Sequence, residues 1–89
     1  MKVYVVVDWH ARILSLSEDD APALAKFKEL VLSAEDYQTI VFQEMDLTSC
    51  ECKMLMSHRN SEIVAYDDSL TGIAADLSDE RHALNDCED

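Results

Sequence analysis

The sequence predicts an α+β fold, a small antiparallel sheet with one helix packed on a face. Two runs of strand-forming residues, 2–8 and 37–47, flank a helical stripe of apolar residues over 22–34. The 89 residues, 48% of them apolar, are enough for one core. We therefore expect residues 1–89 to form a single small domain, whose acidic tail frays after about residue 85.

The chain opens with a predicted β-hairpin. Residues 2–8, Lys-Val-Tyr-Val-Val-Val-Asp, are apolar at almost every position, which is typical of an inner strand. Residues 12–17 largely alternate between apolar and polar side chains and predict a second strand. Trp9, His10 and Ala11 lie between the two strands and would form the turn.

A helix is predicted from close to Pro22 to Ala34. Pro22 is tolerated only in the first helical turn, and Ser17, Asp19 and Asp20 are candidate N-caps before it. Apolar residues then recur every three or four positions and make one stripe: Leu24, Phe27, Leu30, Val31 and Ala34.

Residues 37–47 are rich in strand formers, with apolar side chains on both faces. A strand here completes a β-β-α-β order, in which the helix lies on one face of the sheet. Because the second face of this strand is also apolar, something else must cover that face or extend the sheet.

Residues 48–57 support two interpretations. Thr48 with Glu51 three residues later fits a capping box, which predicts a helix. The alternation of four apolar residues with polar ones predicts a strand instead, and these are Cys50, Cys52, Met54 and Met56. The pattern slightly favours the strand, in a hairpin with residues 63–66.

The remaining elements are a turn, a strand and a short helix. Residues 58–61 resemble a turn, and the composition of residues 63–66 predicts a strand. Further on, a short helix is expected to begin at Ser78 among many acids.

Four segments of the first half form a familiar pattern. They are Val3-Tyr4-Val5-Val6-Val7-Asp8-Trp9, Ile13–Ser17, Ser17-Glu18-Asp19-Asp20-Ala21, and Ile40-Val41-Phe42-Gln43-Glu44. Together they resemble small phage and prophage proteins of β-β-α-β type, most of which have no assigned function. The resemblance covers residues 2–47, while Pro22 and residues 48–89 depart from the pattern. It implies a phage setting, in which anti-CRISPR and other anti-defence inhibitors are relevant.

Charge is the most informative functional feature of the sequence. The formal net charge is −12, from 19 acidic and 7 basic residues. A phosphate backbone is bound by Lys and Arg, so this balance argues against direct binding of nucleic acid. Eight acids follow Tyr66, against Arg81 as the single base. Spaced carboxylates can imitate phosphates and occupy a basic cleft, although they also keep a small protein soluble.

These observations predict a non-enzymatic inhibitor that binds a basic, nucleic-acid-handling protein through its acidic surface. The CRISPR interference machinery is the most specific partner that we name. No cofactor is expected. The residues expected to bind the partner are five acids and two aromatic residues: Asp67, Asp68, Asp76, Asp79, Glu80, Trp9 and Tyr66.

Catalysis and metal binding have weaker support. Asp8 and His10 share a face if the first strand continues through them, so they could act as a base and its orienting group. A polar hairpin turn is the commoner role for such residues. A zinc site would draw on Cys50, Cys52 and His58, with His82 or Cys87. A single Cys-x-Cys is a much weaker signal for zinc than paired Cys-x-x-Cys motifs are. We therefore expect reduced thiols and no metal.

Two alternative functions stay open. A structural or housekeeping phage domain could self-associate through its sheet edge, and a metal-sensing regulator could use Cys50, Cys52 and His58. The sequence has no apolar run of the ~18 residues that a membrane span needs, and it has no secretory signal. We therefore expect a cytoplasmic protein of the host cell, monomeric or homodimeric, without a membrane partner.

The protein alone should not bind nucleic acid, because its 7 Lys and Arg residues are scattered along the chain. A gel-shift titration with duplex DNA and with single-stranded RNA at moderate salt checks this, with a basic DNA-binding protein as the positive control. A tight complex would contradict the charge argument.

Overall fold

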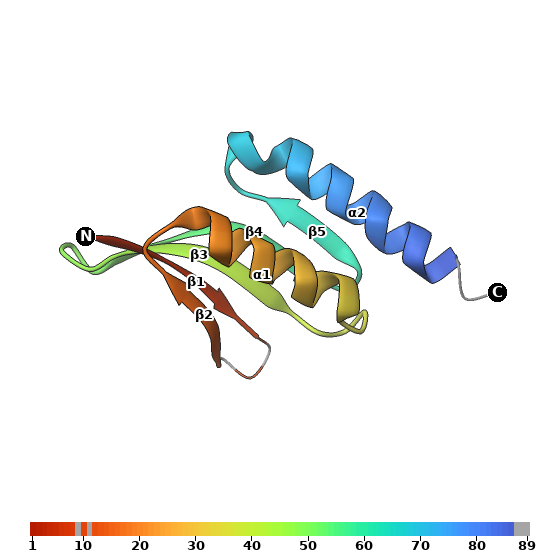
Figure 1. Ribbon diagram of the computed structural model, residues 1–89, viewed down its shortest axis with the longest axis horizontal. Coiled ribbons are helices and arrows are strands. Elements are labelled where there is room, and N and C mark those ends of the chain that lie inside the picture. Colours follow the sequence, from red (N-terminus) through yellow and green to blue (C-terminus); the bar gives the residue numbers. More distant parts are fainter. Residues whose placement is uncertain (9, 11, 87–89) are drawn as a thin grey trace.

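In the computed structural model, which describes residues 1–8, 10 and 12–86, five strands and two helices form two layers (Figure 1). The elements are β1 (Lys2–Val7), β2 (Ile13–Ser17), α1 (Asp20–Ser33), β3 (Ile40–Asp46), β4 (Glu51–Arg59), β5 (Glu62–Ala65), the short 3₁₀ turn η1 (Asp68–Leu70) and α2 (Thr71–Asp86). The strands form one antiparallel sheet in the order β2-β1-β3-β4-β5. This arrangement confirms the predicted α+β class and the β-β-α-β order of the first half.

β1 is the inner strand that its apolar run predicts, since it pairs with β2 on one side and with β3 on the other. Val6 lies opposite Phe42 of β3 and points into the core. Its neighbours Val5 and Val7 point to the opposite face, because successive side chains of a strand alternate. An apolar run therefore serves both faces of the sheet.

The predicted β1–β2 hairpin is also confirmed. Its turn is closed by Asp8, whose backbone N–H donates to the carbonyl of Arg12 at 3.1 Å. Trp9 and Ala11, two of the expected turn residues, lie outside the described residues.

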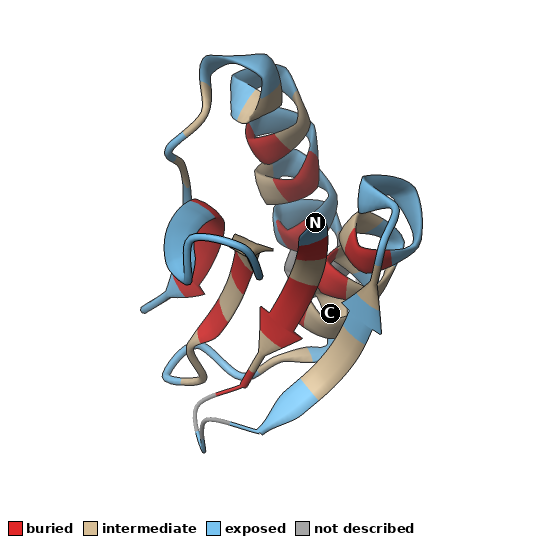
Figure 2. Ribbon diagram, turned by 90° about the vertical axis from the view of Figure 1, so that its left-hand side faces the viewer, coloured by how far each residue is buried: buried red, intermediate tan, exposed pale blue. Residues whose placement is uncertain are grey.

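Both helices cover the same face of the sheet, and the core lies between the two layers. Figure 2 shows buried positions on the inner strands and on the helix turns. Phe27 of α1 and Phe42 of β3 are fully buried, with their ring centroids 6.0 Å apart. The buried cluster comprises Val6, Ala23, Phe27, Val31, Ile40, Phe42, Leu55, Met56, Ala74 and Leu77.

α1 forms close to its predicted position. Ala23, Phe27 and Val31 recur every four residues and form its fully buried stripe, while Leu24 and Leu30 are only partly buried. Pro22 is the third residue of the helix, where its missing N–H has no intrahelical acceptor to lose.

The boundaries of β3 and β4 correct the sequence-based expectations. β3 begins at Ile40 rather than at Tyr37, because residues 36–37 form a turn and Tyr37 is 72% exposed. Residues 51–59 form β4, so the hairpin interpretation of residues 48–57 is right and the helix is wrong. The β3–β4 turn leaves the capping-box pattern unused, and Cys50 takes a positive φ of 62° within it.

The turn expected at residues 58–61 is shorter than predicted. His58 and Arg59 continue β4, and the turn consists of Asn60 and Ser61, which both have positive φ (51° and 67°). Asn tolerates this left-handed conformation better than most residues. β5 then follows at Glu62–Ala65, as the apolar run predicts.

α2 is longer than the short helix expected from Ser78. It begins at Thr71, directly after η1, and ends at Asp86, while the tail expected to fray after about residue 85 falls mostly on residues outside the described chain. The signal that could have located it is a sparse stripe among the acids, made of Leu70, Ile73, Ala74, Leu77 and Arg81. Arg81, the polar residue at the last position of the stripe, hides this periodicity. Residues 87–89 lie outside the described chain.

The second face of the sheet carries no helix in the described part of the chain, and we call it the helix-free face. β4 and β5 extend the sheet beyond β3, so the expected extension is confirmed while the apolar second face stays uncovered. The strand pairings assign fifteen residues to this face: Val3, Val5, Val7, Ile13, Leu16, Val41, Gln43, Met45, Cys52, Met54, Ser57, Arg59, Glu62, Val64 and Tyr66.

Phe27→Ala should lower the free energy of unfolding by about 3–5 kcal/mol, because the ring is fully buried and leaves a cavity. Leu30→Ala is the matched control on the same helix and should cost less, since Leu30 is only partly buried. Urea unfolding followed by circular dichroism measures both. Equal midpoints for the two variants would mean that the helix face is assigned wrongly.

Candidate functional site

The acids expected to bind a partner lie mainly on α2. Asp76, Asp79 and Glu80 are exposed there, and Asp68 is exposed in η1. Lys28 of α1 shares a small hollow with Asp76 and Glu80. The structure therefore brings four of the five predicted acids onto the helical layer.

Asp67 has a different environment from the other acids. Its carboxylate accepts hydrogen bonds from the backbone N–H of Ser69 at 3.0 Å and from the Ser69 hydroxyl at 2.8 Å. The Lys53 amine lies 3.4 Å from the other carboxylate oxygen. These interactions lower the pKa of Asp67, and the hydrogen bond from the Ser69 backbone N–H has the largest effect. Asp67 thus caps η1 and is half-buried, so its first role is structural.

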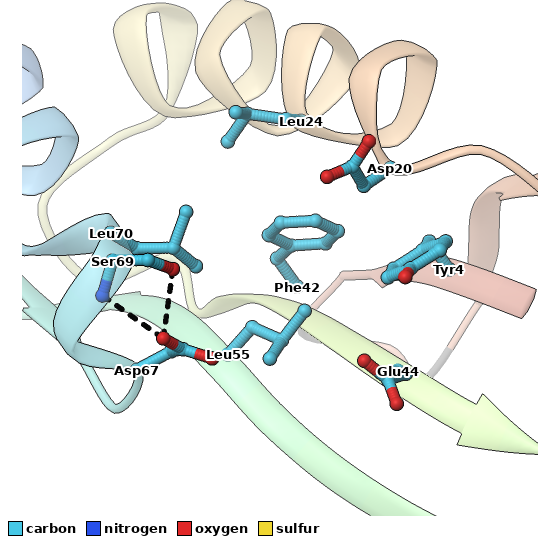
Figure 3. A pocket seen from close by; sticks show the side chains of 9 residues that line it. All are labelled: Tyr4, Asp20, Leu24, Phe42, Glu44, Leu55, Asp67, Ser69 and Leu70. Carbon is cyan, nitrogen blue, oxygen red and sulfur yellow. Dashed lines mark hydrogen bonds between the residues drawn. The ribbon is translucent and has the colours of Figure 1, made fainter. Parts of the chain in front are cut away.

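Beside this cap, the helical layer and the sheet enclose a hollow of about 150 Å³ (Figure 3). Its apolar side chains come from four different elements, and carboxylates from three places in the chain surround them. Nine residues line it: Tyr4, Asp20, Leu24, Phe42, Glu44, Leu55, Asp67, Ser69 and Leu70. Figure 3 shows the Phe42 ring between the leucines and Tyr4, with the three carboxylates set around this apolar group.

The three carboxylates of the hollow differ in their partners. The Glu44 carboxylate lies 3.1 Å from the Lys2 amine. The hydrogen bond to Glu44, together with the negative charge of Glu44, raises the pKa of Lys2. The Asp67 carboxylate forms an ion pair with the Lys53 amine, as described above. Asp20 lies in the first turn of α1, where the helix dipole favours a negative charge.

The hollow has the chemistry to hold one cationic side chain. An aliphatic stem of Lys or Arg can lie on Leu24 and Leu70, while its charged head reaches a carboxylate. Tyr4 adds an aromatic ring that a guanidinium can stack on. No sequence pattern indicates this site, because Tyr4 and Glu44 fit strand patterns and Asp20 fits a helix start.

The two aromatic residues expected at the interface do not join the acids. Tyr66 lies on the helix-free face, 54% exposed, with its hydroxyl 3.2 Å from that of Ser57. Trp9 is outside the described residues, so its role stays a prediction. An acidic interface on α2 would therefore not include Tyr66.

The residues considered for catalysis hold the β1–β2 turn together. The Asp8 carboxylate accepts hydrogen bonds from the backbone N–H groups of His10 and Arg12, and it pairs with the Arg12 guanidinium at 2.7 Å. Burial alone would raise the pKa of Asp8, but the hydrogen bonds from Arg12 and His10 lower it overall. The backbone of His10 donates this bond, so the Asp8 contacts described are those of a closed turn.

The residues considered for zinc are separated along β4. Cys50 and Cys52 are exposed at its start, and the Cys52 thiol donates to the Gln43 side chain at 3.0 Å. His58 is buried near the other end of the strand. Within residues 1–8, 10 and 12–86, no three His, Cys, Asp or Glu side chains converge on a position for a metal ion.

A buried polar cluster, which the sequence analysis missed, joins the two helices. Arg81 of α2 donates to the carbonyls of Val31 and Ala34 at 2.9 and 2.8 Å, and to the Asp36 carboxylate at 2.7 Å. Hydrogen bonds from Ser61 and Arg81 lower the pKa of Asp36. Arg81 therefore supplies a donor to the Ala34 carbonyl and a second donor to the Val31 carbonyl, which also accepts from the Ala34 N–H.

His58 completes this cluster from β4. Its Nδ1 lies 2.8 Å from the carbonyl of Gln38, which fixes the proton on Nδ1 in the neutral ring. Burial lowers the pKa of His58 below its ordinary value of 6.5; the Gln38 carbonyl and Asp36 oppose this shift and Arg81 adds to it. The cluster has a structural role at the junction of the layers.

Comparisons with protein-family models, with curated proteins and with solved structures give no match. None of the helices in the described part of the chain has the length and hydropathy needed to cross a bilayer.

Acid should destabilise the wild type more than His58→Gln in the range below pH 6.5. The depressed pKa means that the unfolded state binds the His58 proton more readily, so this contribution is complete above pH 6.5 and is lost as the pH falls. The slope cannot exceed about 1.4 kcal/mol per pH unit for one proton. Urea unfolding of both proteins between pH 7.5 and 5 measures the difference. Parallel pH profiles would show that His58 does not titrate in this way.

Proposed function

We propose that this protein is a non-enzymatic acidic inhibitor that captures a basic, nucleic-acid-handling protein. The observation that carries the proposal is the set of exposed acids on η1 and α2, which we call the acidic row, with a hollow at the η1 end that is itself surrounded by carboxylates. These carboxylates stand in for the phosphates of the partner's usual ligand. The CRISPR interference machinery is the most specific partner in this proposal, on the resemblance of residues 2–47 to phage proteins.

The energetics favour a role in association over a role in stability. Exposed carboxylates contribute little to the folded state, and Asp68, Asp76, Asp79 and Glu80 have no cation paired with them within the described residues. A net charge of −12 attracts a basic surface over a distance of about one Debye length, roughly 8–10 Å at physiological salt. Such steering mainly raises the association rate.

The hollow supplies what the acidic row lacks, which is a defined position for one partner side chain. The leucines and Phe42 remove water from an aliphatic stem, and Asp20 and Glu44 offer oxygens for its charged end. A Lys or Arg of the partner fits this chemistry. The acidic row would then guide the encounter, while the hollow would slow the release.

A second candidate function is a structural phage domain that self-associates. It is favoured by a different observation, the exposed apolar residues of the edge strand β2, where Ile13 is 63% and Leu16 is 64% exposed. The acidic surface has no part in this alternative.

The partner is to be isolated by retaining proteins from a bacterial lysate on the immobilised chain and identifying them by mass spectrometry. The four exposed acids are then neutralised together as Asp68→Asn, Asp76→Asn, Asp79→Asn and Glu80→Gln. The association rate with the captured protein should fall by about tenfold at low salt, and this difference should shrink as salt rises.

The matched control neutralises four exposed acids around α1, with the same change in net charge: Glu18→Gln, Asp19→Asn, Glu29→Gln and Glu35→Gln. It should slow association much less, because none of these residues belongs to η1 or α2. Equal rates for wild type and the α2 variant across a salt titration would show that the acids only keep the protein soluble.

A further inference from the structure

The turn end of the β4–β5 hairpin carries a second hollow, which shares no residue with the hollow beside Asp67. Its volume is about 290 Å³ and its lining residues are Ser57, Arg59, Asn60, Glu62, Val64 and Tyr66. The strand pairing explains why these side chains meet. Arg59 lies opposite Glu62, and Ser57 lies opposite Val64, so their side chains are neighbours on the helix-free face. The hollow therefore combines a cation, an anion, hydroxyls and an apolar group.

The two charged residues of this hollow have no partner of opposite charge. Arg59 and Glu62 are both exposed, and neither forms an ion pair with any residue in the described part of the chain. They do not pair with each other either, although they are direct neighbours across the hairpin. Most of the other basic residues are paired with a carboxylate. The hollow thus presents separate positive and negative groups that are both available to a ligand.

The rest of the hollow is held in place by the chain itself. Asn60 and Ser61 form a two-residue turn with positive φ, and the Ser61 backbone N–H donates to the carbonyl of Asp36 at 3.2 Å. The hydroxyls of Ser57 and Tyr66 lie 3.2 Å apart. Because one hydroxyl donates to the other, one O–H proton stays free for a ligand.

We propose that this hollow binds one free α-amino acid that has an apolar or aromatic side chain. The α-carboxylate of the ligand accepts hydrogen bonds from the Arg59 guanidinium, and its α-ammonium donates to the Glu62 carboxylate. The ligand side chain lies on Val64 and on the ring of Tyr66, which are 41% and 54% exposed. Each charge of the ligand then meets an opposite charge of the hollow.

The charges of the chain select a zwitterion over other small ligands. A phosphate or a nucleotide adds negative charge to a chain of net charge −12, and it also meets Glu62. A simple cation meets Arg59. An amino acid is neutral overall, so the net charge of the chain does not repel it. The volume also agrees with a ligand of this size, since sites for larger, drug-sized molecules span about 300–1,000 Å³.

This inference is independent of the proposed function. The hollow shares no residue with the acidic row, and its ligand is a small molecule rather than a basic protein. Loss of partner capture therefore leaves amino-acid binding unchanged, and the reverse also holds.

The test is a titration of the ¹⁵N-labelled full chain with L-phenylalanine, followed by the backbone amide signals in NMR spectra. We expect saturable shifts within residues 57–66 and a dissociation constant of roughly 0.1–3 mM, as suits about a dozen non-hydrogen atoms. Phenylalaninamide lacks the carboxylate and N-acetylphenylalanine lacks the ammonium, so each should bind about fivefold more weakly. Inorganic phosphate at equal ionic strength should leave these signals in place.

Two variants connect each charge of the ligand to one residue. Arg59→Gln should bind phenylalanine about fivefold more weakly and should no longer discriminate against phenylalaninamide. Glu62→Gln should weaken binding similarly and should no longer discriminate against N-acetylphenylalanine. A residue that only supports the hairpin would not change these preferences one at a time.

Lys28→Gln and Glu18→Gln are the matched controls, because they remove the same charges outside the hollow. Their dissociation constants should stay within twofold of wild type, and circular dichroism melts should show that all variants fold. The three phenylalanine compounds test the wild type by themselves if a variant unfolds. No saturable shift up to about 20 mM, equal binding of the three compounds, or unchanged preferences in the folded variants would overturn the proposal.

Discussion

The Arg81 guanidinium is the contact on which the arrangement of the helical layer depends. It is a side chain of α2, yet its hydrogen bonds go to the end of α1 and to the loop before β3. A charged group is buried here only because backbone carbonyls and the Asp36 carboxylate surround it. With these bonds in place, α1 and α2 are held side by side on one face of the sheet. Everything described on the two faces follows from that one-sided arrangement.

One-sided covering gives the molecule two surfaces of opposite character. The helical layer presents carboxylates to solvent, because the apolar stripes of both helices are used against the sheet. The other side presents the second row of side chains from the same strands, which are mostly apolar, with Arg59 and Glu62 at the end of the β4–β5 hairpin.

The candidate site depends on residues that are far apart in the sequence. Tyr4, Asp20 and Glu44 come from β1, α1 and β3, and Asp67 precedes η1. Each fits its local element, so no local pattern marks it as part of a hollow. Only the pairing of β1 with β3 and the position of α1 above them bring these groups together. The acids of α2 are different, since their number and spacing are visible in the sequence itself.

The sequence by itself determined the fold class, the inner position of β1, the hairpin, α1 and the surplus of acids, because periodicity and composition are local properties of the chain. It left residues 48–57 open between helix and strand, and placed the start of α2 seven residues late. Those outcomes were decided by tertiary structure: β4 gains its backbone hydrogen bonds from β3 and β5, and the first turns of α2 gain their stability by packing Ala74 and Leu77 into the core. Tertiary structure also decided that both helices lie on one face. The buried hydrogen bonds of Arg81 and His58 form only when segments distant in the sequence meet.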